Sequence, residues 1–116
     1  MGLLDRFRGG RGSTGHTASD IRYLADWVRT HTGVEAYIEP KTTVTDVTAV
    51  LVAADGEWTR RIVGESGARR LADRLGIPVY DVGRTGYPQR MRDYDARRRI
   101  ERKRAFDAEL RDLSAE

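Results

Sequence analysis

Basic residues are concentrated in one stretch of this chain, between Arg84 and Arg104. That stretch holds nine arginines and lysines against three acidic residues, a net charge of +6, whereas the whole chain carries +3. The remaining residues therefore carry a net charge of −3. Guanidinium groups bind phosphate bidentately, and each neutralised phosphate releases counterions that add to the affinity. This segregation of charge predicts a surface that binds a nucleic-acid backbone.

Two tyrosines interleave with the basic residues, and aromatic rings are platforms on which unpaired bases stack. The predicted binding residues are Arg84, Tyr87, Arg90, Arg92, Tyr94, Arg97, Arg98, Arg99 and Arg102. A simpler interpretation is a solvated helix whose arginines pair with neighbouring acids, as Asp93–Arg97 and Asp95–Arg99 would at i,i+4 spacing. Three consecutive arginines at 97–99 exceed what the nearby acids can pair. The first hypothesis is therefore non-catalytic binding of nucleic acid, RNA rather than DNA, or of a ribonucleoprotein.

A protein-interaction module is the second hypothesis. Phe106, Leu110 and Leu113 are spaced i, i+4 and i+7 near the end of the chain. This spacing places them on one side of a helix, which is enough for a short contact with a partner helix or with a second copy of the chain.

A third hypothesis comes from the expected order of helices and strands, with Asp46 just before an apolar strand and Thr59-Arg60-Arg61 across the following hairpin. This arrangement resembles the core of the restriction-endonuclease-like nucleases, in which an Asp and a Glu/Gln-x-Lys hold magnesium beside the scissile phosphate. The resemblance implies a magnesium-dependent nuclease site at Asp46, Glu57 and Arg61. The third strand has no second carboxylate and no lysine, and Glu57 lies at the turn. The resemblance therefore implies a nuclease-type fold that does not cleave, with an active nuclease as the alternative.

Other chemistry finds little support in the sequence. The chain has no cysteine, which excludes disulfides, thiolate metal sites and a cysteine nucleophile and is typical of a reducing cytosol. Its two histidines, His16 and His31, have no acidic neighbours at ligand spacing. We therefore expect no metal, no cofactor and no enzymatic activity.

The fold is predicted from hydrophobic periodicity. A helix is expected from Ser19 to Gly33, an edge strand over 34–39, a central strand over 47–53 and, after the Asp55-Gly56 turn, a strand over 58–63. A helix over 64–76, a strand over 77–82 and a long helix over 90–113 complete the chain. The predicted class is α/β (α+β), a helix-strand-strand-strand-helix-strand core with a four-stranded mixed sheet and a projecting C-terminal helix.

The predicted organisation is a flexible segment over 1–17, a core domain over 18–82 and a basic loop and helix over 83–116. Leu3, Leu4 and Phe7 offer a short apolar side that would suit docking on a membrane surface or a partner. No apolar run is long enough to span a membrane, so a cytoplasmic protein is expected. Arginine is used in place of lysine almost throughout, and the chain resembles a small bacterial α/β protein.

Overall fold

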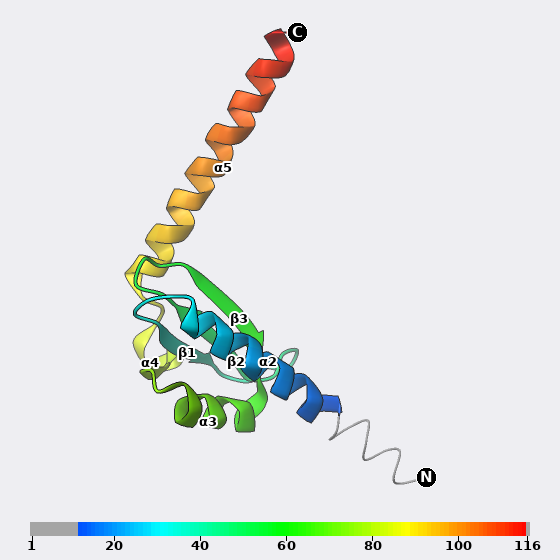
Figure 1. Ribbon diagram of the computed structural model, residues 1–116, viewed down its shortest axis with the longest axis vertical. Coiled ribbons are helices and arrows are strands. Elements are labelled where there is room, and N and C mark those ends of the chain that lie inside the picture. The colour runs from blue at the N-terminus through cyan, green and yellow to red at the C-terminus, as the bar shows by residue number, and fades with distance from the viewer. Residues whose placement is uncertain (1–11, 116) are drawn as a thin grey trace.

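The computed structural model describes residues 12–115 of the chain (Figure 1). The predicted fold class is confirmed. In chain order the elements are α2 (Gly12–Arg29), β1 (Glu35–Glu39), β2 (Thr48–Val52), β3 (Trp58–Ile62), α3 (Gly64–Leu75), β4 (Val79–Asp81), α4 (Val82–Thr85) and α5 (Gln89–Ala115).

The four strands form one mixed sheet in the order β3-β2-β1-β4. β2 lies antiparallel to both β1 and β3, and β4 lies parallel to β1. Asp55 and Gly56 make the tight turn between β2 and β3 as predicted: Gly56 has a φ of +94°, and the Asp55 carboxylate accepts a hydrogen bond from the Glu57 amide at 3.0 Å. All five residues of β2 are buried, as expected for a strand covered on both faces.

The prediction that residues 34–39 form an edge strand is wrong. β4 pairs with β1 from Ala36↔Val79 to Ile38↔Asp81, so β1 is an interior strand. Pro40 follows the last residue of β1 and therefore removes no hydrogen bond from the ladder. The sheet edge next to β1 is formed by β4, which is only three residues long.

The N-terminal end of α2 also differs from the expected one. The helix begins at Gly12, so Ser19 lies inside it and is not its N-cap. Part of the segment 1–17, expected to be flexible, is therefore helical, because adding residues to an existing helix costs far less than nucleating one. Leu3, Leu4 and Phe7 lie outside the described residues.

The larger core lies between the sheet and the two helices α2 and α3. Its side chains come from both layers: Leu24 and Trp27 of α2, Leu71 of α3, and Ala36, Ala49 and Leu51 of the strands. These positions follow the 3.6-residue period of a helix and the two-residue period of a strand, which is why each element buries one side here. The opposite face of the sheet carries a smaller cluster formed by Tyr37, Val50, Val52 and Met91.

α5 covers that second face only with its first turns and then leaves the body (Figure 1). Met91 is its one buried residue. The remaining turns project into solvent and give the molecule extents of 65 × 35 × 28 Å. No helix in the described part of the chain is both long and apolar enough to cross a lipid bilayer.

Candidate nucleic-acid interface

Arg90, predicted to bind phosphate, is instead the residue that fastens α5 to the sheet. Its guanidinium donates to a Glu35 carboxylate oxygen at 2.7 Å and to the Ala53 carbonyl at 2.9 Å. Glu35 also accepts hydrogen bonds from the hydroxyls of Tyr37 and Tyr80. The bond from Arg90 is the main reason that the pKa of Glu35 is lowered from its ordinary value. A guanidinium committed to a half-buried carboxylate in this way is not free for a polyanion.

Tyr87 is engaged in a similar way. Its hydroxyl donates to the carboxylate of Glu39, which also receives two hydrogen bonds from Arg60 at 3.1 and 2.9 Å. The Tyr87 ring packs against the smaller core cluster. Glu39 and Glu35 both belong to β1, so this strand binds the loop before α5 through Tyr87 and the first turn of α5 through Arg90. The Tyr87 ring is thus unsuited to base stacking.

Several other predicted residues are held by nearby groups. Arg92 donates to the Gln89 side chain, and Arg97 donates to the Asp55 carbonyl at 3.1 Å with its guanidinium 5.7 Å from the Tyr94 ring centre. The i,i+4 pairs Asp93–Arg97 and Asp95–Arg99 do not form: Asp93 accepts from Gln89, and Asp95 from Trp58. Arg84 is exposed on α4.

The four remaining residues of the predicted binding set lie close together: Tyr94, Arg98, Arg99 and Arg102. α5 leaves the body beside the start of β3, and the concave angle between them has a volume of about 480 Å³. We call this site the Trp58 corner; it is lined by Trp58, Tyr94, Asp95, Arg98, Arg99 and Arg102. Tyr94, Arg98 and Arg102 are spaced at four-residue intervals, which places them on adjoining turns of the same side of α5.

Contacts with the body fix the aromatic part of the Trp58 corner. The Trp58 indole nitrogen donates to the Asp95 carboxylate at 2.8 Å, and the Arg60 guanidinium lies 5.3 Å from the centre of its ring. The indole is thus half-buried and oriented while it still lines the concavity. A ring held in place in advance loses little conformational entropy when a flat ligand stacks on it.

The cationic part of the corner is largely uncompensated. Arg98 reaches Glu101 at 3.4 Å, a long contact between two exposed side chains. Within residues 12–115, the guanidiniums of Arg99 and Arg102 make no hydrogen bond and no ion pair. Arg104, farther along the helix, has no such partner in that range either. The corner is therefore lined by three arginines and one carboxylate, Asp95; Arg98 has an acidic partner on its own helix, whereas Arg99 and Arg102 have none among the described residues.

Trp58 was missed as a site residue by sequence reasoning. Its position in an alternating strand indicated only that it would lie on one face of a sheet. Its place in the Trp58 corner depends on a helix that begins 31 residues later. The one usable signal was an aromatic residue two positions before an arginine on the same strand face.

The residues of the nuclease alternative are not brought together. Asp46 precedes β2, and its carboxylate accepts from the Val47 amide at 2.7 Å. Glu57 lies opposite Ala53 at the other end of the β2–β3 hairpin, roughly 20 Å away at 3.3–3.4 Å per residue. Arg61 faces α2, with its guanidinium 3.8 Å from the Tyr23 ring centre. Among the described residues no group of three acidic or histidine side chains could hold a metal ion.

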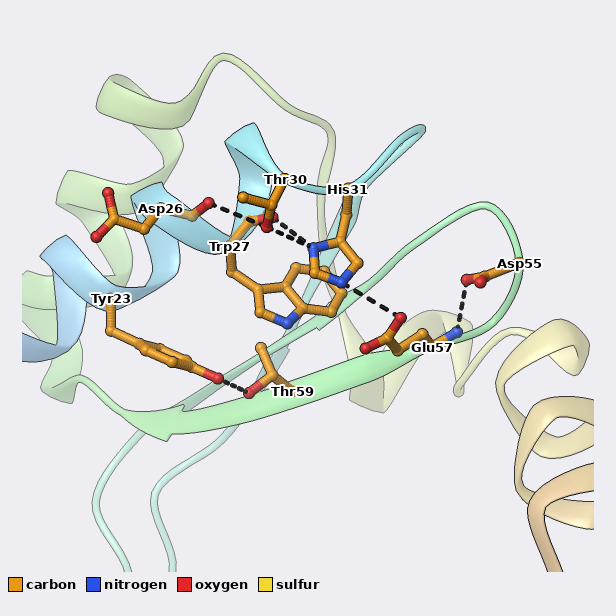
Figure 2. Close-up of polar contacts among 8 residues, drawn as sticks. All are labelled: Tyr23, Asp26, Trp27, Thr30, His31, Asp55, Glu57 and Thr59. Atoms are coloured by element: carbon orange, nitrogen blue, oxygen red, sulfur yellow. Dashed lines mark hydrogen bonds and ion pairs between the residues drawn. The ribbon is translucent and has the colours of Figure 1, made fainter.

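His31 lies in a polar cluster that joins the end of α2 to the start of β3 (Figure 2). Its ring stacks on Trp27 with 3.7 Å between ring centres, Nδ1 lies 2.8 Å from the Trp27 carbonyl oxygen, and Nε2 lies 3.3 Å from a Glu57 carboxylate oxygen. The neighbouring hydroxyl of Thr30 bonds to backbone carbonyls of the helix. The ring therefore has polar groups of the chain beside both nitrogens, and its contacts join the end of α2 to Glu57 at the start of β3.

Comparisons of the chain with protein-family models, with curated proteins and with solved structures found no match. Functional inference therefore rests on the geometry of the chain itself.

Proposed function

We propose that this chain binds nucleic acid without catalysis, RNA in preference to DNA, through the Trp58 corner and the adjoining cationic side of α5. The observation that carries the proposal is the position of Arg99 and Arg102, two guanidiniums without a partner among the described residues, beside an oriented indole. A cytoplasmic location in a bacterium is part of the same proposal.

The chemistry of the corner matches an unpaired nucleotide better than a duplex. Arg98, Arg99 and Arg102 supply hydrogen-bond donors and positive charge for phosphates, and Trp58 and Tyr94 supply ring surface for one base. Bases inside a duplex are stacked on each other and cannot reach such a ring. Proteins that recognise RNA mostly bind loops, bulges and ends, where bases are splayed out.

The electrostatic part of the proposal is tested with the double substitution Arg99→Ala/Arg102→Ala. Binding of a short single-stranded RNA is measured by fluorescence anisotropy between about 50 and about 200 mM salt. We expect about a tenfold loss of affinity at the lower salt. Two lost phosphate contacts should also flatten the slope of log K against log[salt] by about 1.4.

The matched control is Arg29→Ala/Arg69→Ala, which removes the same charge from exposed positions where each arginine pairs with an acid on its own helix. This control should bind RNA almost like the unmodified chain. Equal losses in the two double variants would show that net charge alone matters, and affinity independent of salt would exclude phosphate binding altogether.

The stacking part is tested separately with Trp58→Ala. Base–aromatic stacking is worth about 1–3 kcal/mol per base, so affinity for single-stranded RNA should fall by roughly tenfold or more while duplex RNA is little affected. Circular dichroism of the variant checks that the fold survives. An equal fall for both RNA forms would contradict recognition of an unpaired base.

A further inference from the structure

The last turns of α5 expose apolar side chains to solvent. Phe106, Leu110 and Leu113 are 59 %, 46 % and 63 % exposed, and their spacing places them along one side of the helix. We call residues 105–115 the free end of α5. It differs from the cationic part of the helix in charge as well: Asp107, Glu109 and Asp112 outnumber Arg111, for a net charge of −2. The free end is thus an acidic amphipathic helix with no other element beside it.

A groove that is apolar and basic lies on the opposite face of the sheet from the start of α5. α2 and α3 pack side by side over the sheet, and between them is a hollow of about 370 Å³. We call it the α2–α3 groove; it is lined by Ala18, Ile21, Arg22, Ala25, Arg70, Arg74 and Leu75. The alanine, isoleucine and leucine side chains make an apolar floor, and the three arginines stand around it.

The positive charges of the three arginines in the α2–α3 groove are not paired with acidic side chains of the described residues. The guanidiniums of Arg22, Arg70 and Arg74 make no hydrogen bond and no ion pair with any of the residues from 12 to 115. Other arginines of the same two helices do pair: Arg29 with Asp26 and Arg69 with Glu65. An apolar floor with three free guanidiniums suits a ligand that is both apolar and acidic.

We propose that the free end of α5 from a second copy of this chain docks in the α2–α3 groove. Phe106, Leu110 and Leu113 would cover the apolar floor, and the net charge of −2 would meet the three groove arginines. An amphipathic helix laid into an apolar groove is a recurrent mode of recognition. The proposal concerns residues outside the Trp58 corner and does not depend on RNA binding.

A second copy is required because a chain cannot dock its own free end. α5 starts on the sheet face opposite α2 and α3 and then runs away from the body as an uninterrupted helix (Figure 1). The contact joins two different surfaces: two copies that exchange free ends reciprocally form a closed, two-fold symmetric dimer, and one-way docking is heterologous and forms an open chain. In either case each docking contact joins the free end of one copy to the groove of another.

The test is a complementation experiment by sedimentation velocity on protein freed of nucleic acid. The free-end variant is Phe106→Ser/Leu110→Ser, and the groove variant is Arg70→Glu/Arg74→Glu. The unmodified chain should self-associate as its concentration rises, and each variant alone should do so at least about tenfold more weakly. An equimolar mixture should form a 1:1 complex, because one copy contributes an intact groove and the other an intact free end.

Three results would overturn the proposal. An unmodified chain that stays monomeric up to millimolar concentration has no such contact. A groove variant that associates like the unmodified chain would show that two free ends pair with each other. A mixture that stays monomeric while both variants remain folded by circular dichroism would show that the surfaces do not meet. Arg29→Glu/Arg69→Glu, with the same change of charge outside the groove, serves as the control and should associate normally.

Discussion

The base of α5 (residues 89–97) and its outer part (residues 100–115) belong to one continuous helix, but only the base is fixed by other elements. In the base, Met91 is buried, Arg90 binds Glu35, and Arg97 reaches the turn before β3. In the outer part, the polar contacts of the described residues stay within the helix, as in Lys103–Asp107. An arginine on this helix therefore either holds the helix to the sheet or is free to bind a ligand. Which of the two it does depends on whether a strand or its turn places a hydrogen-bond acceptor beside its guanidinium.

The largest effect is expected from a substitution at the contact between the base of α5 and the β2–β3 hairpin. Gly56 has a positive φ, and a Cβ there would lie 2.1 Å from the Arg90 carbonyl oxygen and 2.8 Å from the Tyr94 Cβ. Gly56→Ala should lower the free energy of unfolding by about 3 kcal/mol and loosen the base of α5. Chemical denaturation measures the loss. Gly76→Ala, also at positive φ but with open space around it, should lower the free energy of unfolding by only about 1 kcal/mol. Equal losses in the two variants would show that the base of α5 is not closely packed against the hairpin.

A smaller loss is expected from Arg90→Ala. The substitution leaves the half-buried Glu35 carboxylate without its cation and the Ala53 carbonyl without this donor. The free energy of unfolding should fall by about 2 kcal/mol, a value reduced for partial exposure of the pair. Arg104→Ala in the outer part should stay within about 0.5 kcal/mol. If both variants had the same stability, the distinction between bound and available arginines would be wrong.

The mildest test uses pH. The pKa of Glu35 is lowered in the folded chain, chiefly by Arg90, so the folded state binds fewer protons than the unfolded state in this range. The stability contributed by Glu35 is complete above its ordinary pKa of about 4.5 and is lost as the pH falls through the lowered value. Urea unfolding between about pH 3 and about pH 7 should show this acid-dependent loss. Glu35→Gln should flatten it, and an unchanged acid dependence would contradict the ion pair.

Local signals in the sequence were sufficient for most of the fold. The Asp55-Gly56 pair specified the hairpin, the apolar run of β2 specified a strand buried on both faces, and the spacing of Ile21, Leu24 and Val28 specified a helix. The interior place of β1 in the sheet could not be predicted from such local signals. An alternating pattern shows that a strand has two different faces, but it does not show whether another strand pairs with its second edge.

The candidate site was predicted in part. Arg98, Arg99, Arg102 and Tyr94 do gather in one place, as helical periodicity allows. The partners of Arg90 and Tyr87 lie 55 and 48 residues away in the sequence, so no local pattern could reveal them. The same reason explains why Trp58 was missed: its setting is created by packing between distant segments.

The order of the strands has a further consequence for how copies of this chain meet. One edge strand of the sheet is β4, three residues long and followed at once by α4, and the other is β3, which carries Arg60 on one face and Arg61 on the other. Brevity and charge both discourage strands of another molecule from extending a sheet. Growth into fibrils by addition of strands should therefore be disfavoured in concentrated solution.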